Sequence, residues 1–171
     1  VIGGGGEWML RLGMKTDKRI TAVRESIEMV KRSSADKPLA YHGKVFKVYG
    51  FQPKYATDPA PLVYAGANRE KMLRASVAAG DGVMYSDMPR GLVQKMTDTV
   101  REALQVAGRP VDGYRISNIW AWHFKQDRKA ALHEARRELL LRGWLDTWYL
   151  ESFLSADESD FITQNKGAFY K

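Results

Sequence analysis

The stretch Leu62-Val63-Tyr64-Ala65-Gly66-Ala67-Asn68 decides the fold class of this chain. Its first four residues form a short apolar run, which is typical of a parallel strand buried on both faces. Small residues end that run, and a helical pattern follows from Arg69 to about Ala79. A second buried run, Val83 to Ser86, comes next. A strand, a helix and a further strand in this order predict a βαβ unit with parallel strands.

The same alternation extends on both sides of this unit. A helix is predicted from Pro89 to Val106, and a strand is predicted from Tyr114 to Phe124. Toward the N-terminus, Val1-Ile2 ends a strand, a helix is predicted from Thr16 to Arg32, and Tyr41 to Phe51 predicts a short hairpin. These elements predict an α/β fold with a parallel sheet, either doubly wound or closed as a (β/α) barrel.

Composition excludes several classes of protein. The 171 residues are 44% hydrophobic and 27% charged, which is ordinary for one globular domain. No apolar run approaches the roughly 20 residues that span a bilayer, so we expect no membrane partner. The chain has no cysteine, which removes disulfides and sulfur-ligated metals and fits a cytoplasmic location. The three histidines lack the i, i+4 spacing of a metal pair, so no metal site is expected.

The net charge of +7 does not indicate nucleic-acid binding, because acidic residues are mixed into every basic stretch. Most of these charges are expected on solvated helix faces. A small anionic ligand, such as a phosphorylated cofactor, is the better use of a local basic excess.

Two candidate sites follow strands. Glycines at Gly3 to Gly6 would let a planar or phosphorylated ligand approach the backbone, and Glu7 would lie at the rim of that site. The alternative is a flexible loop with a solvated glutamate. The run is not a dinucleotide fingerprint, because the third glycine of that motif is replaced by Met9.

The second candidate is the passage Gly66-Ala67-Asn68, where a strand leads into a helix. The first N–H groups of a helix are unpaired and lie at the positive end of its dipole, so this passage can bind a phosphate. Ser86, at the end of the following strand, could donate its hydroxyl to the same phosphate. The alternatives are a tight turn without ligand and, around Ser86, a turn with a core strand.

In this order, the segments resemble the bacterial-luciferase-like superfamily of flavin- and deazaflavin-dependent oxidoreductases. The likeness is strongest to its branch of coenzyme F420-dependent methylenetetrahydromethanopterin reductases. The matching pieces extend over residues 2–125, and residues 126–171 match only as a helical extension. They are Gly4-Gly5-Gly6-Glu7, Leu12-Gly13, Arg19, Arg24-Glu25-Ser26-Ile27, Tyr41-His42-Gly43-Lys44-Val45-Phe46, Pro61 to Ala67, Leu73-Arg74-Ala75 and Ala79 to Val83.

The resemblance implies a (β/α)8 TIM barrel of the luciferase-like type. Residues 1–6, 62–65, 83–86 and 115–123 would be its fourth to seventh strands. The first three strands and the eighth would then be missing, so residues 1–171 are expected to form one domain that is an incomplete portion of a longer barrel, with 126–171 as a helical extension or insertion. A homodimer is also expected.

The resemblance also assigns residues and a reaction. Gly66, Ala67 and Asn68 would give backbone N–H groups to the cofactor phosphate, and Ser86 or Tyr85 would add a donor. Gly4, Gly5 and Gly6 would pass close to the cofactor ring, with Glu7 as the catalytic acid or base. The implied function is hydride transfer between coenzyme F420 and an organic small-molecule substrate. An FMN-dependent luciferase-like monooxygenase and a non-catalytic flavin-binding or truncated relative are the alternatives.

Overall fold

The computed structural model describes residues 1–5, 12–13, 17–55, 57, 59–141 and 147–169. Contacts between residues divide the chain into two compact units. The first unit comprises residues 1–88 and 94–119, and the second comprises residues 89–93 and 120–171.

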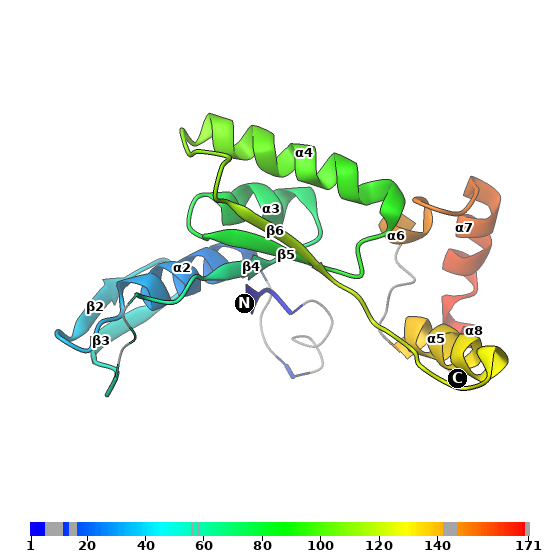
Figure 1. Ribbon diagram of the computed structural model, residues 1–171, viewed down its shortest axis with the longest axis horizontal. Coiled ribbons are helices and arrows are strands. Elements are labelled where there is room, and N and C mark those ends of the chain that lie inside the picture. Colours follow the sequence, from blue (N-terminus) through cyan, green and yellow to red (C-terminus); the bar gives the residue numbers. More distant parts are fainter. Residues whose placement is uncertain (6–11, 14–16, 56, 58, 142–146, 170–171) are drawn as a thin grey trace. The chain divides into compact units, whose positions relative to one another are not determined.

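The first unit is built on a parallel sheet of four strands in the order β1-β4-β5-β6 (Figure 1). The strands are β1 (Ile2–Gly3), β4 (Tyr64–Gly66), β5 (Gly82–Ser86) and β6 (Arg115–Ile119). They run in sequence order across the sheet, and every pairing among them is parallel. The α/β class and the four strands predicted from the sequence are therefore confirmed. The predicted strand at 114–124 is shorter, because its last residues leave the sheet after Ile119.

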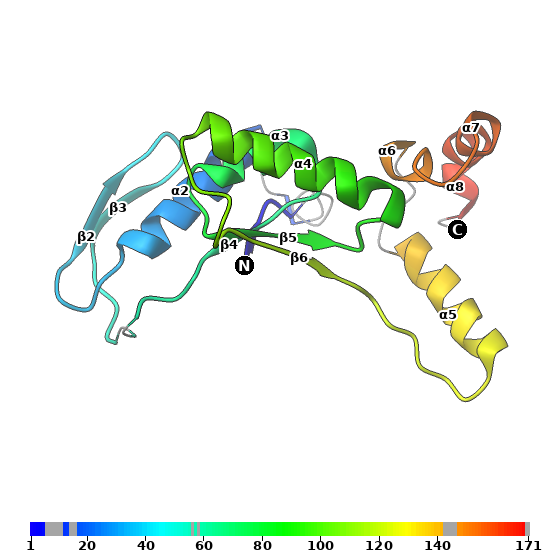
Figure 2. The same cartoon turned by 45° about the horizontal axis from the view of Figure 1, so that its top comes forward.

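Helices cover one face of this sheet. They are α2 (Arg19–Arg32), α3 (Glu70–Val77) and α4 (Arg90–Val106). Val23 and Ile27 of α2 pack on Val63 and Ala65 in a buried cluster, and Met72 of α3 packs against the same cluster. Figure 2 shows α3 and α4 over the same face of β5 and β6. Parallel strands are ordinarily covered on both faces. Here Val63 and Ala65 are buried but Leu62 is 51% exposed, so the predicted burial of Leu62 to Ala65 on both faces is not observed among the described residues.

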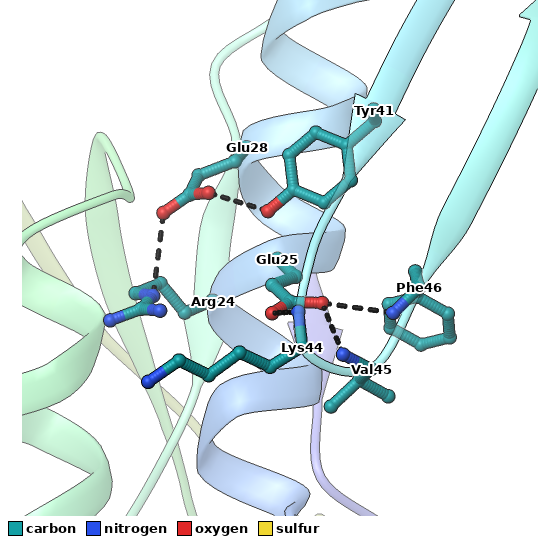
Figure 3. A network of polar contacts seen from close by, with 7 residues as sticks. All are labelled: Arg24, Glu25, Glu28, Tyr41, Lys44, Val45 and Phe46. Atoms are coloured by element: carbon teal, nitrogen blue, oxygen red, sulfur yellow. Dashed lines mark hydrogen bonds and ion pairs between the residues drawn. The ribbon is translucent and has the colours of Figure 1, made fainter.

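The predicted hairpin is also present, as the antiparallel pair β2 (Leu39–His42) and β3 (Lys47–Phe51). Its turn is fixed to α2 by the buried carboxylate of Glu25 (Figure 3). The N–H groups of Lys44, Val45 and Phe46 donate to that carboxylate at 2.7, 3.0 and 3.0 Å. Burial opposes the charge, but these three donors outweigh it and hold the pKa of Glu25 below its ordinary value.

The second unit holds the remaining helices, α5 (Arg128–Leu141), α6 (Thr147–Leu150), α7 (Ala156–Gln164) and α8 (Lys166–Phe169). These helices agree with the helical character expected of residues 126–171, and the start of α7 has a recognisable sequence signal. Ser155 accepts the N–H of Glu158, and the Glu158 carboxylate accepts the N–H of Ser155, which is a capping box. Within the described residues, no helix is long and apolar enough to cross a membrane.

Candidate functional site at the carboxyl edge of the sheet

The predicted cofactor-binding residues meet at one edge of the parallel sheet. Register places Gly3 beside Gly66, and Gly66 beside Met84 of β5. The carboxyl ends of β1, β4 and β5 thus lie next to each other (Figure 1), followed by the end of β6. In barrels built from parallel strands, ligands bind at this edge.

The backbones of β1 and β4 approach each other closely at Gly3 and Gly66, where no side chain separates them. A Cβ atom on Gly66 would lie 3.3 Å from Val1 Cγ1 and 3.5 Å from the Cα of Gly3. A Cβ on Gly4 would meet Met72 Cε at 3.1 Å, on the side of the helices. Gly5 has a φ of 55°, which glycine adopts without steric cost. Gly6 and Glu7 lie outside the described residues.

The amino end of α3 follows directly. Arg69 is the N-cap residue, and its side chain does not cap the helix. Glu70 in the first turn accepts a hydrogen bond from Arg74 Nε at 2.9 Å. Arg69 and Lys71 are exposed beside this helix end. Two cations and the positive end of the helix dipole therefore lie together at the carboxyl edge, where they favour an anion.

The assignment of Ala67 as a phosphate donor is corrected by the structure. Its N–H donates to the carbonyl oxygen of Met84 at 3.1 Å, so the sheet already uses it. The parallel ladder continues one residue beyond β4, and a ladder donor cannot also serve a ligand. Ala67 contributes a small buried side chain instead.

The Ser86–Met88 turn, defined as residues 86–88, has its three backbone N–H groups engaged as well. Asn68 Oδ1 accepts the N–H of Ser86 at 2.9 Å, and Asn68 Nδ2 donates to the Ser86 carbonyl at 2.8 Å. The N–H of Asp87 donates to Ile119 O at 2.7 Å. Asn118 forms the same pair of bonds with Met88: its Oδ1 accepts the Met88 N–H at 3.1 Å, and its Nδ2 donates to the Met88 carbonyl at 3.2 Å. The donor that Ser86 can offer a ligand is therefore its hydroxyl, and not its amide.

Tyr85, the alternative to Ser86, is a core residue. Side chains alternate along a strand, so Val83 and Tyr85 share the face that is buried under the helices. Tyr85 is 1% exposed, whereas Ser86 on the opposite face is only half-buried. Burial raises the pKa of the Tyr85 hydroxyl. We therefore correct the pair of predicted donors to Ser86 alone.

A model of the luciferase-like monooxygenase family matches residues 1–166. The chain belongs to that family. Among curated proteins, it is 25% identical over 126 residues to a 5,10-methylenetetrahydromethanopterin reductase of Archaeoglobus fulgidus. That alignment covers 74% of this chain and 38% of the reductase.

Solved structures show the same fold. The coenzyme F420 dependent tetrahydromethanopterin reductase from Methanopyrus kandleri superposes with a TM-score of 0.76 at 17% identity, over 97% of this chain and 53% of that one. An F420-dependent secondary alcohol dehydrogenase, solved with an F420-acetone adduct, gives a TM-score of 0.66 at 17% identity. That superposition covers 88% of this chain and 45% of the dehydrogenase chain. The chain spans about half or less of these relatives, and its sheet is part of a luciferase-like TIM barrel.

One residue at the edge of this luciferase-like sheet was missed by the sequence analysis. Asn118 lies inside β6, where asparagine is unusual because strands disfavour it. An asparagine in a strand pattern was a visible signal. Its hydrogen-bond partner, Met88, is 30 residues away from Asn118, so only the fold brings the two residues together. Among the described residues, no group of three or more histidine, aspartate or glutamate side chains could hold a metal.

Proposed function

We propose that the protein containing this chain is an oxidoreductase that transfers hydride between coenzyme F420 and an organic small-molecule substrate. The observation that carries this proposal is the small-residue carboxyl edge with the uncapped α3 amino end, in a family whose matched relatives are named as F420-dependent enzymes. FMN with oxygen is the second candidate, because the matching family model is named for monooxygenases.

The edge fits a phosphorylated cofactor by its shape and its charge. Gly3 is exposed and Gly66 is half-buried, and neither has a side chain that would keep a ligand from the backbone. Helix α3 offers its dipole together with Arg69 and Lys71. Asn68 remains our proposed backbone contact to the phosphate, and the Ser86 hydroxyl adds a donor from β5. Gly66, which pairs with strands on both sides, is proposed to let the phosphate come close to the backbone. Gly4, Gly5 and Gly6 are proposed to pass beside the ring.

When bound, the deazaflavin or flavin supplies the hydride chemistry, and the protein supplies orientation and electrostatics. The residues of this chain hold the phosphate at one end of the cofactor and keep the backbone close to its ring. Glu7 is proposed to move a proton at an atom near the ring, which requires that its surroundings raise its pKa toward neutrality. A homodimer and a cytoplasmic location stay predictions.

The deciding experiment is a spectroscopic titration of the full-length protein with coenzyme F420 and with FMN in parallel. Tighter binding of F420 supports the reductase or dehydrogenase proposal. Tighter binding of FMN favours the monooxygenase. A folded protein that binds neither cofactor contradicts both enzyme proposals and favours a non-catalytic relative.

Gly66→Asp should weaken cofactor binding much more than Gly66→Asn. Both side chains need the same space beside Val1 and Gly3, but only aspartate places a negative charge against the phosphate. We expect the aspartate variant to bind at least about tenfold more weakly than the asparagine variant, a difference of about 1.4 kcal/mol. Equal affinities of the two variants, measured by the same titration, would remove the phosphate from this edge.

Glu7→Gln tests the proton-transfer role. The amide cannot exchange a proton at neutral pH, so we expect kcat to fall about 100-fold while cofactor affinity stays within a factor of two or so. Asp17→Asn, which removes an exposed carboxylate nearby in sequence, is the control. Steady-state turnover of the Glu7 variant at the wild-type rate would show that this carboxylate has no part in the reaction.

A further inference from the structure

The Ser86–Met88 turn is held more firmly than an ordinary strand end. Asp87 has a φ of 49°, a left-handed conformation with a free-energy cost for a residue other than glycine. Such conformations persist where the surroundings over-determine them, and they cluster at functional sites. Five hydrogen bonds to the backbone of this turn fix its conformation here.

Four of the five bonds come from two asparagine side chains. Asn68 follows β4 and forms two hydrogen bonds with the backbone of Ser86. Asn118 lies in β6 and forms two with the backbone of Met88, and this second pair is called the Asn118 bracket. Each amide accepts an N–H with its oxygen and donates to the carbonyl of the same residue with its nitrogen. The two amides therefore extend the pairing of β5 beyond the point where the strand ladder stops. They hold the turn from both neighbouring strands.

We propose that Asn118 and Asn68 are positioning residues, which hold the Ser86–Met88 turn so that the Ser86 hydroxyl stays in place for the cofactor phosphate. This inference rests on the proposed function, because it assigns a role within the same site. Asn68 serves both sides of the site, since its amide fixes Ser86 and its backbone enters the α3 amino end. Asn118 acts on the turn alone, which makes it the sharper residue to change.

Loss of the Asn118 bracket should loosen the turn without removing any proposed cofactor contact. In Asn118→Ala, the N–H and carbonyl of Met88, a residue with 0% exposure, lose both partners. Asn118→Asp keeps the side-chain shape but turns a second oxygen toward the Met88 carbonyl, so it loses the donor. We expect both variants to loosen the turn, and Asn118→Asp to do so less, because its carboxylate still accepts the Met88 N–H.

Two measurements on the full-length protein test this role. Without cofactor, hydrogen exchange of a peptide containing residues 86–88 should be at least about tenfold faster in both Asn118 variants, while residues 70–77 of α3 keep wild-type exchange. In the titration, affinity for the cofactor that wild type binds should fall about tenfold, since small displacements of a positioned group are costly. The control is Thr99→Ala, which removes a buried hydroxyl that donates to Lys95 O at 3.1 Å in α4. It should leave both readouts unchanged.

The outcomes separate this inference from the proposed function. Wild-type protein that binds neither cofactor would overturn the proposed function, and the positioning role with it. Wild-type binding that both Asn118 variants retain in full, or that Thr99→Ala weakens equally, would overturn the positioning role alone. Faster exchange at 86–88 together with the selective loss of affinity would support it.

Discussion

Gly82→Ala should destabilise the protein by about 3 kcal/mol or more, enough to unfold a marginally stable domain. Gly82 pairs with Arg115 at the start of β5. A Cβ atom on this glycine would lie 2.5 Å from the Arg115 carbonyl oxygen and 2.6 Å from the ring of Tyr64. A backbone oxygen of a paired strand cannot move aside, so the β5–β6 pairing itself would have to open.

The measurement for Gly82→Ala is urea unfolding of wild type and variant, followed by circular dichroism. Gly167→Ala is the matched control, because a Cβ atom there meets nothing within 4 Å. We expect the control to unfold within about 0.5 kcal/mol of wild type. A Gly82 variant that is equally stable would show that β5 and β6 do not pair as described.

Glu25→Gln should destabilise the protein by about 2–4 kcal/mol at neutral pH, chiefly by releasing the β2–β3 hairpin from α2. The carboxylate accepts three N–H groups with its two oxygens. The amide has only one oxygen, and its NH2 group would face a backbone donor. Glu102→Gln, which removes an exposed partner of Arg74, is the control and should cost less than about 1 kcal/mol.

The stabilisation from Glu25 should depend on pH with a definite sign. Its pKa is lower in the folded protein than its ordinary value of 4.5, so the unfolded chain binds the proton first as pH falls. The contribution is therefore complete above about pH 4.5 and is lost as pH falls through the folded pKa. The difference in unfolding free energy between wild type and Glu25→Gln should shrink over that range. A difference that stays constant from pH 7 to pH 3.5 would contradict the lowered pKa.

The part of the candidate site that depends only on neighbouring residues in the chain was predicted from the sequence. A strand that ends in small residues before a helix places those residues between the two elements, so the position of Gly66 and Asn68 at the β4–α3 junction was predicted without the fold. Their role in binding stays a prediction. The choice between Tyr85 and Ser86 was left open, because the faces of a strand alternate and only packing decides which face the helices cover. The role of Ala67 also required the observed ladder, since its N–H could serve either a ligand or Met84.

By itself, the sequence determined the α/β class, the four parallel strands and the hairpin, because short apolar runs and helical hydrophobic spacing are local properties of the chain. Only the tertiary structure decided how the ends of those strands are held. The Asn118 bracket on Met88 joins residues 30 apart, and the Glu25 anchor joins a helix to a turn about 20 residues later. A polar side chain gives the same signal in a sequence whether it meets water or a buried backbone group. Its partner is chosen when folding brings distant segments together, and the free energy of that contact exists only in the assembled structure.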